Sequence, residues 1–226
     1  FSDSFRHLRP DDMLISQKPE EFTKNFIINP LLKILDFEDN DFIKETKQTF
    51  DESRRWADYT IKVNNNFVLL EAKALNIDLY TKDSAISQVR EWLISKQTPT
   101  NYGIATDGFL WVMVKFDEDV LRIQELKTIN LRPLFLELIG QKNLMNVKEL
   151  LDDFYLSLSK GNIIHTFKEE SYQLEMEREK ISQSFYSHYM DYIFGVNSKD
   201  GSPIRQYSLL TAVKPPSSSS DLDISL

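Results

Sequence analysis

Three charged residues, Asp58, Glu71 and Lys73, have the types and spacing needed to hold a divalent cation beside a positioned ammonium group. Asp58 begins one run of β-forming residues, while Glu71 and Lys73 end a second run that is almost wholly apolar. Charges at the end of a buried strand are costly unless they are paired or bind a metal. Because side chains alternate along a strand, Glu71 and Lys73 share one face and Ala72 takes the other. The pattern predicts two carboxylates that converge on a cation.

A predicted β-hairpin must position these charges. The runs 59–63 and 67–70 flank three consecutive asparagines, which are typical turn residues. Pairing of the two runs folds Asp58 back toward Glu71. The alternative interpretation is a turn residue at Asp58 and a surface ion pair between Glu71 and Lys73, and it is the usual one for an isolated Glu-x-Lys triplet. The buried run before Glu71 and the upstream aspartate favour the cation site.

Composition indicates a globular protein and restricts its metal chemistry. With 226 residues, of which 41% are hydrophobic and 27% charged, the chain can build one substantial core. No apolar run approaches the roughly 20 residues that span a bilayer, and the start shows no secretory signal. We therefore expect a cytoplasmic protein with no membrane partner, and the absence of cysteine fits this expectation. The three histidines show no zinc-ligand spacing, so the expected metal is a hard ion held by oxygens, such as Mg²⁺.

The net charge of −8 restricts how this chain can contact nucleic acid. Phosphate contacts by basic side chains supply most of the affinity of nucleic-acid-binding proteins. Any DNA binding is therefore expected to depend on a local basic patch or on other domains. The chain also begins at Phe1 without an initiator methionine, which fits a portion of a larger polypeptide.

Hydrophobic periodicity predicts a mixed sheet flanked by helices, that is, an α/β fold. Pro30 should interrupt the first helix near Asn29, because proline lacks the N–H that the helix needs. Asp83 or Ser84 should cap the second helix, which carries Gln88. The predicted elements are, in order, a helix from residue 19, strands at 42–50, 59–63 and 67–70, a helix at 83–96, strands at 102–106, 109–114 and 120–126, and helices at 134–139, 147–158 and 169–194.

The chain divides into four predicted segments. They are an irregular lead-in over 1–18, an α/β core over 19–128, a helical extension over 129–195, and a tail or linker over 196–226. In the extension, aromatic and aliphatic residues recur at helical spacing from 172 to 193. Such a stripe indicates packing in a core or against a partner rather than a cofactor site.

With these elements placed, the sequence from about residue 20 to 115 resembles the PD-(D/E)XK nuclease superfamily. More narrowly, it looks like the N-terminal nuclease domain of type I restriction enzyme R subunits and of related single-chain restriction-modification enzymes. No single motif is specific, and the resemblance depends on their order and spacing. The motifs present are Glu20 or Glu21, Asp58, Glu71-Ala72-Lys73, Gln88 with Trp92, and Thr106-Asp107-Gly108 before Phe109 and Trp111.

This chain departs mildly from the family pattern. Trp92 follows the helical glutamine where the family often has tyrosine, and two glutamates compete for the N-terminal position. We favour Glu21 over Glu20, because it lies six residues before Ile27 on the helix whose apolar residues enter the core.

The resemblance implies a restriction-endonuclease-like fold and a Mg²⁺-dependent deoxyribonuclease, with Mn²⁺ able to substitute. In such a site Asp58, Glu71 and the carbonyl of Ala72 would bind the ion. Lys73 would orient the attacking water and stabilise negative charge. The implied partners are double-stranded DNA and further domains or subunits of a larger restriction enzyme.

Two more residues have implied roles. Gln88 would contact a backbone phosphate or hold the water network, and Glu21 would position the metal or one of its waters. The alternatives are a catalytically silent nuclease-like module that binds DNA or takes part in assembly, and a repair or recombination nuclease of the same fold.

Overall fold

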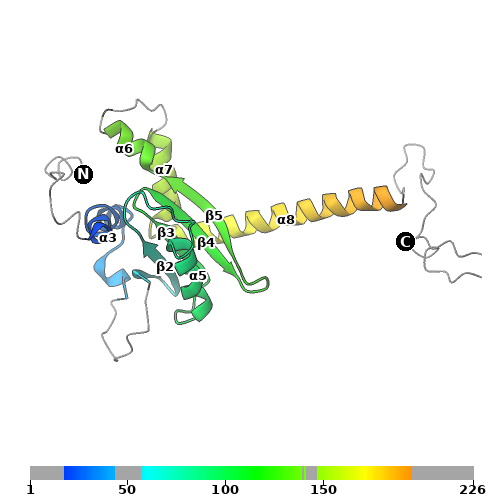
Figure 1. Cartoon of the computed structure of the whole chain (residues 1–226), viewed down its shortest axis with the longest axis horizontal. Helices are drawn as coiled ribbons and strands as arrows, with labels where there is room; N and C mark the ends of the chain where they lie inside the picture. The colour runs from blue at the N-terminus through cyan, green and yellow to red at the C-terminus, as the bar shows by residue number, and fades with distance from the viewer. Residues whose placement is uncertain (1–17, 44–56, 139, 141–146, 195–226) are drawn as a thin grey trace, which may run out of the picture. The chain divides into compact units, whose positions relative to one another are not determined.

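A five-stranded mixed sheet is the centre of the computed structural model, which describes residues 18–43, 57–138, 140 and 147–194 (Figure 1). In order across the sheet, the strands are β1 (Tyr59–Val63), β2 (Asn66–Ala72), β3 (Tyr102–Thr106), β4 (Leu110–Asp117) and β5 (Arg122–Asn130). Adjacent strands are antiparallel except β2 and β3, which run parallel and are connected through helix α5 (Ala85–Ser95). The predicted α/β fold with a mixed sheet and flanking helices is confirmed.

Parts of the predicted organisation lie outside the described residues. These parts are the lead-in up to residue 17, the tail over 196–226 and most of the strand expected over 42–50. Where that expected strand begins, Phe42 forms an isolated antiparallel bridge with Ile61 of β1. None of the described helices is long and apolar enough to cross a membrane.

The predicted hairpin of β1 and β2 is present, but its turn is shorter than the three asparagines expected. Val63 pairs with Asn66, so the turn consists of Asn64 and Asn65, and Asn64 adopts the left-handed conformation with φ of 54°. Asparagine tolerates this conformation better than most residues because its short polar side chain can bond locally. Tyr59 pairs with Leu70 at the open end, which places the residue before β1 beside the end of β2.

Both faces of the sheet are covered, which explains why β2 is apolar on both sides. Val68, Leu70 and Ala72 belong to one buried cluster, whereas Leu69 belongs to a second cluster that includes Val89 of α5. Apolar side chains of the N-terminal helical segments and of α7 (Val147–Leu158) contribute to the first cluster. Glu71 therefore lies on the α5 face, as alternation predicts.

The N-terminal helical region is interrupted before Pro30, as predicted. It consists of α3 (Pro19–Thr23), a π-helical turn over Lys24–Ile28 and α4 (Asn29–Ile34). The Asn29 N–H donates to the Lys24 carbonyl, five residues back. A proline ring clashes with the carbonyl four residues before it in an α-helix, and the wider π turn relieves that clash.

Helices also follow the sheet. They are α6 (Arg132–Leu138), α7 and α8 (Ile163–Phe194), and α8 begins six residues before the predicted helix start at 169. The ring of Phe154 packs 5.4 Å from Trp111, and that of Phe167 lies 4.6 Å from Tyr102, measured between centroids. The compact unit that contains the sheet therefore extends through α7 and the first turns of α8, to Tyr172.

The residues from Gln173 form a second unit. Within the described part of the chain, the aromatic stripe of α8 is exposed, with Ile181 at 69% and Phe185 at 73% of full exposure. The suggestion that this stripe packs in a core is wrong for these residues. An interface with a partner stays a prediction.

Gly103 lets α5 pack closely on β3, and replacing it should be costly. A Cβ at position 103 would lie 2.3 Å from Cγ1 of Val89, a stiff β-branched side chain that is fully buried. We expect Gly103→Ala to lower the free energy of unfolding by about 1–3 kcal/mol, measured by urea denaturation. Gly161→Ala is the matched control, because nothing lies within 4 Å of its added Cβ. Equal stability of the two variants would contradict this packing.

Candidate active site

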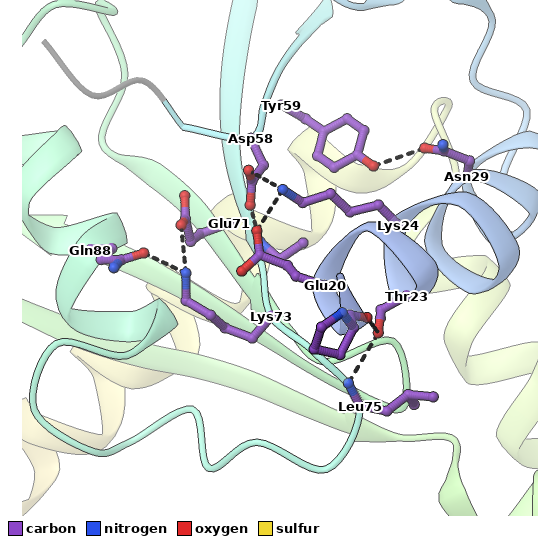
Figure 2. Close-up of polar contacts among 12 residues, drawn as sticks. Glu20, Thr23, Lys24, Asn29, Asp58, Tyr59, Glu71, Lys73, Leu75 and Gln88 are labelled. Carbon is purple, nitrogen blue, oxygen red and sulfur yellow. Dashed lines mark hydrogen bonds and ion pairs between the residues drawn. The ribbon is translucent and has the colours of Figure 1, made fainter. Parts of the chain in front are cut away.

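Asp58 lies at the open end of the hairpin, beside the end of β2 (Figure 2). Its Oδ2 accepts a hydrogen bond of 2.8 Å from the backbone N–H of Ala72. Its Oδ1 accepts one of 2.5 Å from the ammonium of Lys24. The backbone of one strand and a side chain of the N-terminal helical region thus fix the orientation of this carboxylate. Its position beside the end of β2 is the one that the hairpin prediction required.

Glu71 is the buried acid of the site, with 6% of its surface exposed. Its Oε1 accepts a hydrogen bond of 2.9 Å from Lys73, and its Oε2 accepts one of 3.3 Å from the indole N–H of Trp92. Burial raises the pKa of Glu71, the negative charge of Asp58 raises it further, and the hydrogen bond from Lys73 opposes both. The two carboxylates are therefore close enough to repel one another, which a bound cation would relieve.

Lys73 joins β2 to α5. Its ammonium donates to Glu71 and, over 2.6 Å, to Oε1 of Gln88, while its backbone N–H donates to the Thr106 carbonyl of β3 over 2.8 Å. Gln88 in turn donates to the carbonyl of Asp83 over 3.2 Å. The structure therefore brings Asp58, Glu71, Lys73 and Gln88 together.

The predicted cap of α5 is confirmed in its position but not in its hydrogen bond. Ser84 occupies the N-cap position, but its hydroxyl donates to the carbonyl of Asp78 over 2.6 Å and makes no capping hydrogen bond. The serine thereby ties the connection after β2 to the start of α5, which carries Gln88.

The N-terminal helix contributes Glu20 and Lys24 to the site. Lys24 donates to Glu20 over 2.7 Å as well as to Asp58, so one ammonium links two carboxylates. Burial opposes a rise in the pKa of Lys24, but its hydrogen bonds to Asp58 and Glu20 outweigh that effect and raise it. Glu21, the residue favoured from sequence, is exposed, and its role stays a prediction.

Lys24 was not identified from the sequence. Its spacing of four from Glu20 indicates an ion pair on a helix, but that pattern is common on helix surfaces and does not point to Asp58. Lys24 and Asp58 are 34 positions apart in the sequence, so their contact depends on how the N-terminal helical region packs against the hairpin.

The Thr106-Asp107-Gly108 turn supports the site rather than facing it. Oδ1 of Asp107 accepts the backbone N–H groups of Phe109 and Leu110 at 2.9 and 2.7 Å, and Oδ2 accepts that of Asn76 at 3.1 Å. A Cβ at Gly108, where φ is 89°, would lie 3.0 Å from a methyl group of Ile27. This turn thus holds both the N-terminal helical region and the connection that follows Lys73.

The donor set suits a hard divalent cation with few protein ligands. Across the described residues, no group of three or more histidine, aspartate or glutamate side chains could hold a metal ion. Two carboxylates with a backbone carbonyl remain compatible with Mg²⁺, which usually keeps several waters. The two carboxylates repel each other, and each is in contact with an ammonium group. The space beside Asp58 and Glu71 therefore favours positive charge.

Comparison with known proteins shows that this region is similar to parts of restriction enzymes. Residues 19–130 match the family described as the N terminus of the type I restriction enzyme R protein. A protein of Methanocaldococcus jannaschii, whose name describes a proposed type II restriction enzyme and methyltransferase, is 33% identical over 222 residues. The match covers 92% of this chain but 19% of that protein, so this chain spans about a fifth of the relative's length. No solved structure matches the chain.

Proposed function

Residues 19–130 belong to the family of type I restriction enzyme R protein N termini, and on that premise we propose that this chain is a Mg²⁺-dependent DNA endonuclease domain. The observation that carries the proposal is the convergence of Asp58, Glu71 and Lys73 at one end of the hairpin. The buried Glu71 with a raised pKa supports it, because perturbed acids gather at functional sites.

The chemistry requires neutralisation of an anionic phosphodiester. When bound by Asp58, Glu71 and the carbonyl of Ala72, Mg²⁺ would supply that positive charge and acidify a water molecule. Lys73 orients the attacking water and stabilises the negative charge that develops on the phosphate. Gln88 fixes the position of the Lys73 ammonium, and Trp92 holds Glu71 through its indole N–H.

We infer that double-stranded DNA is recognised mainly by other parts of a larger enzyme. The net charge of −8 gives this chain little general attraction for phosphate. The relative's name joins a restriction enzyme to a methyltransferase, and this chain matches a fifth of its length. Further domains or subunits would supply the recognition of a DNA sequence.

The test combines plasmid cleavage with metal binding. Supercoiled plasmid should be nicked or linearised in Mg²⁺ and not in EDTA. Asp58→Ala should abolish this cleavage and weaken Mn²⁺ binding by at least about 100-fold, since even residues that support a metal ligand are worth about 10–100-fold. Asp152→Ala, which removes an exposed carboxylate of α7, is the matched control. Cleavage that persists in Asp58→Ala would overturn the proposal.

The second candidate is a nuclease-like module that takes part in assembly. The exposed apolar side chains of α8 favour it. A metal-binding wild-type chain that cleaves no DNA, even with the remaining domains present, would support this candidate instead.

A further inference from the structure

Lys24 contacts one of the proposed metal ligands directly, although it belongs to a different element (Figure 2). Its side chain is 15% exposed and that of Asp58 is 18% exposed, so water screens this pair only partly. The contact is the shortest between opposite charges at the site, at 2.5 Å.

The two oxygens of Asp58 are held in different ways. Oδ2 accepts the backbone N–H of Ala72, which is fixed within β2. Oδ1 accepts the ammonium of Lys24, which lies at the end of a flexible side chain. Of these two partners, the ammonium is therefore the one that can be exchanged for another cation without disturbing the sheet.

A second acceptor is already present for an ammonium that leaves Asp58. Lys24 also donates to Glu20 at 2.7 Å, and the Glu20 side chain is 41% exposed. Rotation of the lysine side chain away from Asp58 can keep this hydrogen bond. The displaced charge would then move toward solvent rather than become buried without a partner.

We propose that Lys24 is a built-in counter-ion that occupies Asp58 in the metal-free protein and must be displaced before a divalent cation binds there. Two cations that share one carboxylate oxygen repel each other, so the binding of one to Asp58 weakens the binding of the other. Lys24 thereby lowers the metal affinity of the site while it keeps the Asp58 carboxylate oriented. This inference rests on the proposed binding of a divalent cation by Asp58.

The test is titration calorimetry of the 226-residue chain with Mn²⁺. Lys24→Met should bind Mn²⁺ about tenfold more tightly than the wild type, within the range of typical coupling between two sites. Lys33→Met is the control for net charge, because Lys33 is an exposed residue of the neighbouring α4. An affinity equal to wild type in Lys24→Met, or an equal gain in Lys33→Met, would overturn the proposal.

Wild-type protein provides a second measurement that does not depend on the fold of Lys24→Met. In ¹³C NMR spectra of labelled lysine side chains, the Lys24 signal can be assigned by its absence in Lys24→Arg. Saturating Mg²⁺ should shift this signal, and an unchanged signal would contradict displacement. Failure of the proposed function would give a different result, because neither the wild type nor Lys24→Met would then bind Mn²⁺. The proposed metal-dependent function and the proposed displacement of Lys24 would then both be wrong.

Discussion

Replacing Lys73 with methionine is expected to slow DNA cleavage by about 100- to 1,000-fold while leaving Mn²⁺ affinity equal to that of the wild type or tighter. The magnitude is that of removing one positioned donor from a transition state. The ammonium lies 2.9 Å from Glu71 and 2.6 Å from Gln88, which places it beside the proposed metal ligand. Methionine keeps much of the apolar stem and removes only the charged group.

Two measurements separate this loss of rate from a loss of metal binding. Plasmid cleavage under single-turnover conditions gives the rate, and calorimetry with Mn²⁺ gives the affinity. Lys62→Met, which removes an exposed charge of β1, controls for a general loss of attraction for DNA. Loss of metal affinity in Lys73→Met, or an equal loss of rate in Lys62→Met, would show that Lys73 acts otherwise than proposed.

Glu71→Gln should have opposite effects on activity and on stability. Removing this proposed metal ligand is expected to reduce cleavage by more than about 100-fold, since residues that only support ligands are worth about 10–100-fold. The metal-free variant should nevertheless unfold at a higher temperature than the wild type at neutral pH. Burial, and then the charge of Asp58, make the ionised form of Glu71 unfavourable in the folded protein.

The pH dependence of this gain follows from the raised pKa of Glu71. Between the ordinary pKa of 4.5 and the higher pKa of the folded state, the folded protein binds more protons than the unfolded chain. The stability of the wild type therefore falls as pH rises through this interval, and the neutral glutamine of the Glu71→Gln variant avoids that loss. Thermal unfolding in EDTA should show a difference that is large at neutral pH and shrinks as the pH falls toward the ordinary pKa. A difference independent of pH would contradict this origin.

The hairpin and the positions of its charged residues could be predicted because neighbouring residues determine them. The apolar run of β2, the asparagine turn and the alternation of Glu71 with Ala72 all lie within one short stretch of sequence, and the structure confirms the pairing. The interruption before Pro30 was predictable for the same reason, because it follows from the proline itself.

Features set by tertiary packing could not be predicted. The contact of Lys24 with Asp58 depends on the packing of the N-terminal helical region, in which Ile27 lies beside Gly108. No local sequence pattern predicts that packing. The choice between Glu20 and Glu21 depends on the rotation of a helix that changes from α to π within two turns. Ser84 has the right residue type for a cap, yet a carbonyl brought near by the preceding loop takes its hydroxyl.

The turn of Asn64 and Asn65 sits at the end of the hairpin opposite the acids, yet it decides which side chain the ion would meet. Because strand side chains have a period of two, a slip of one residue in the strand pairing at this turn would replace Glu71 by an aliphatic neighbour on the α5 face. The chemical identity of the site thus depends on the strand register that begins at a solvent-exposed turn far from the acids.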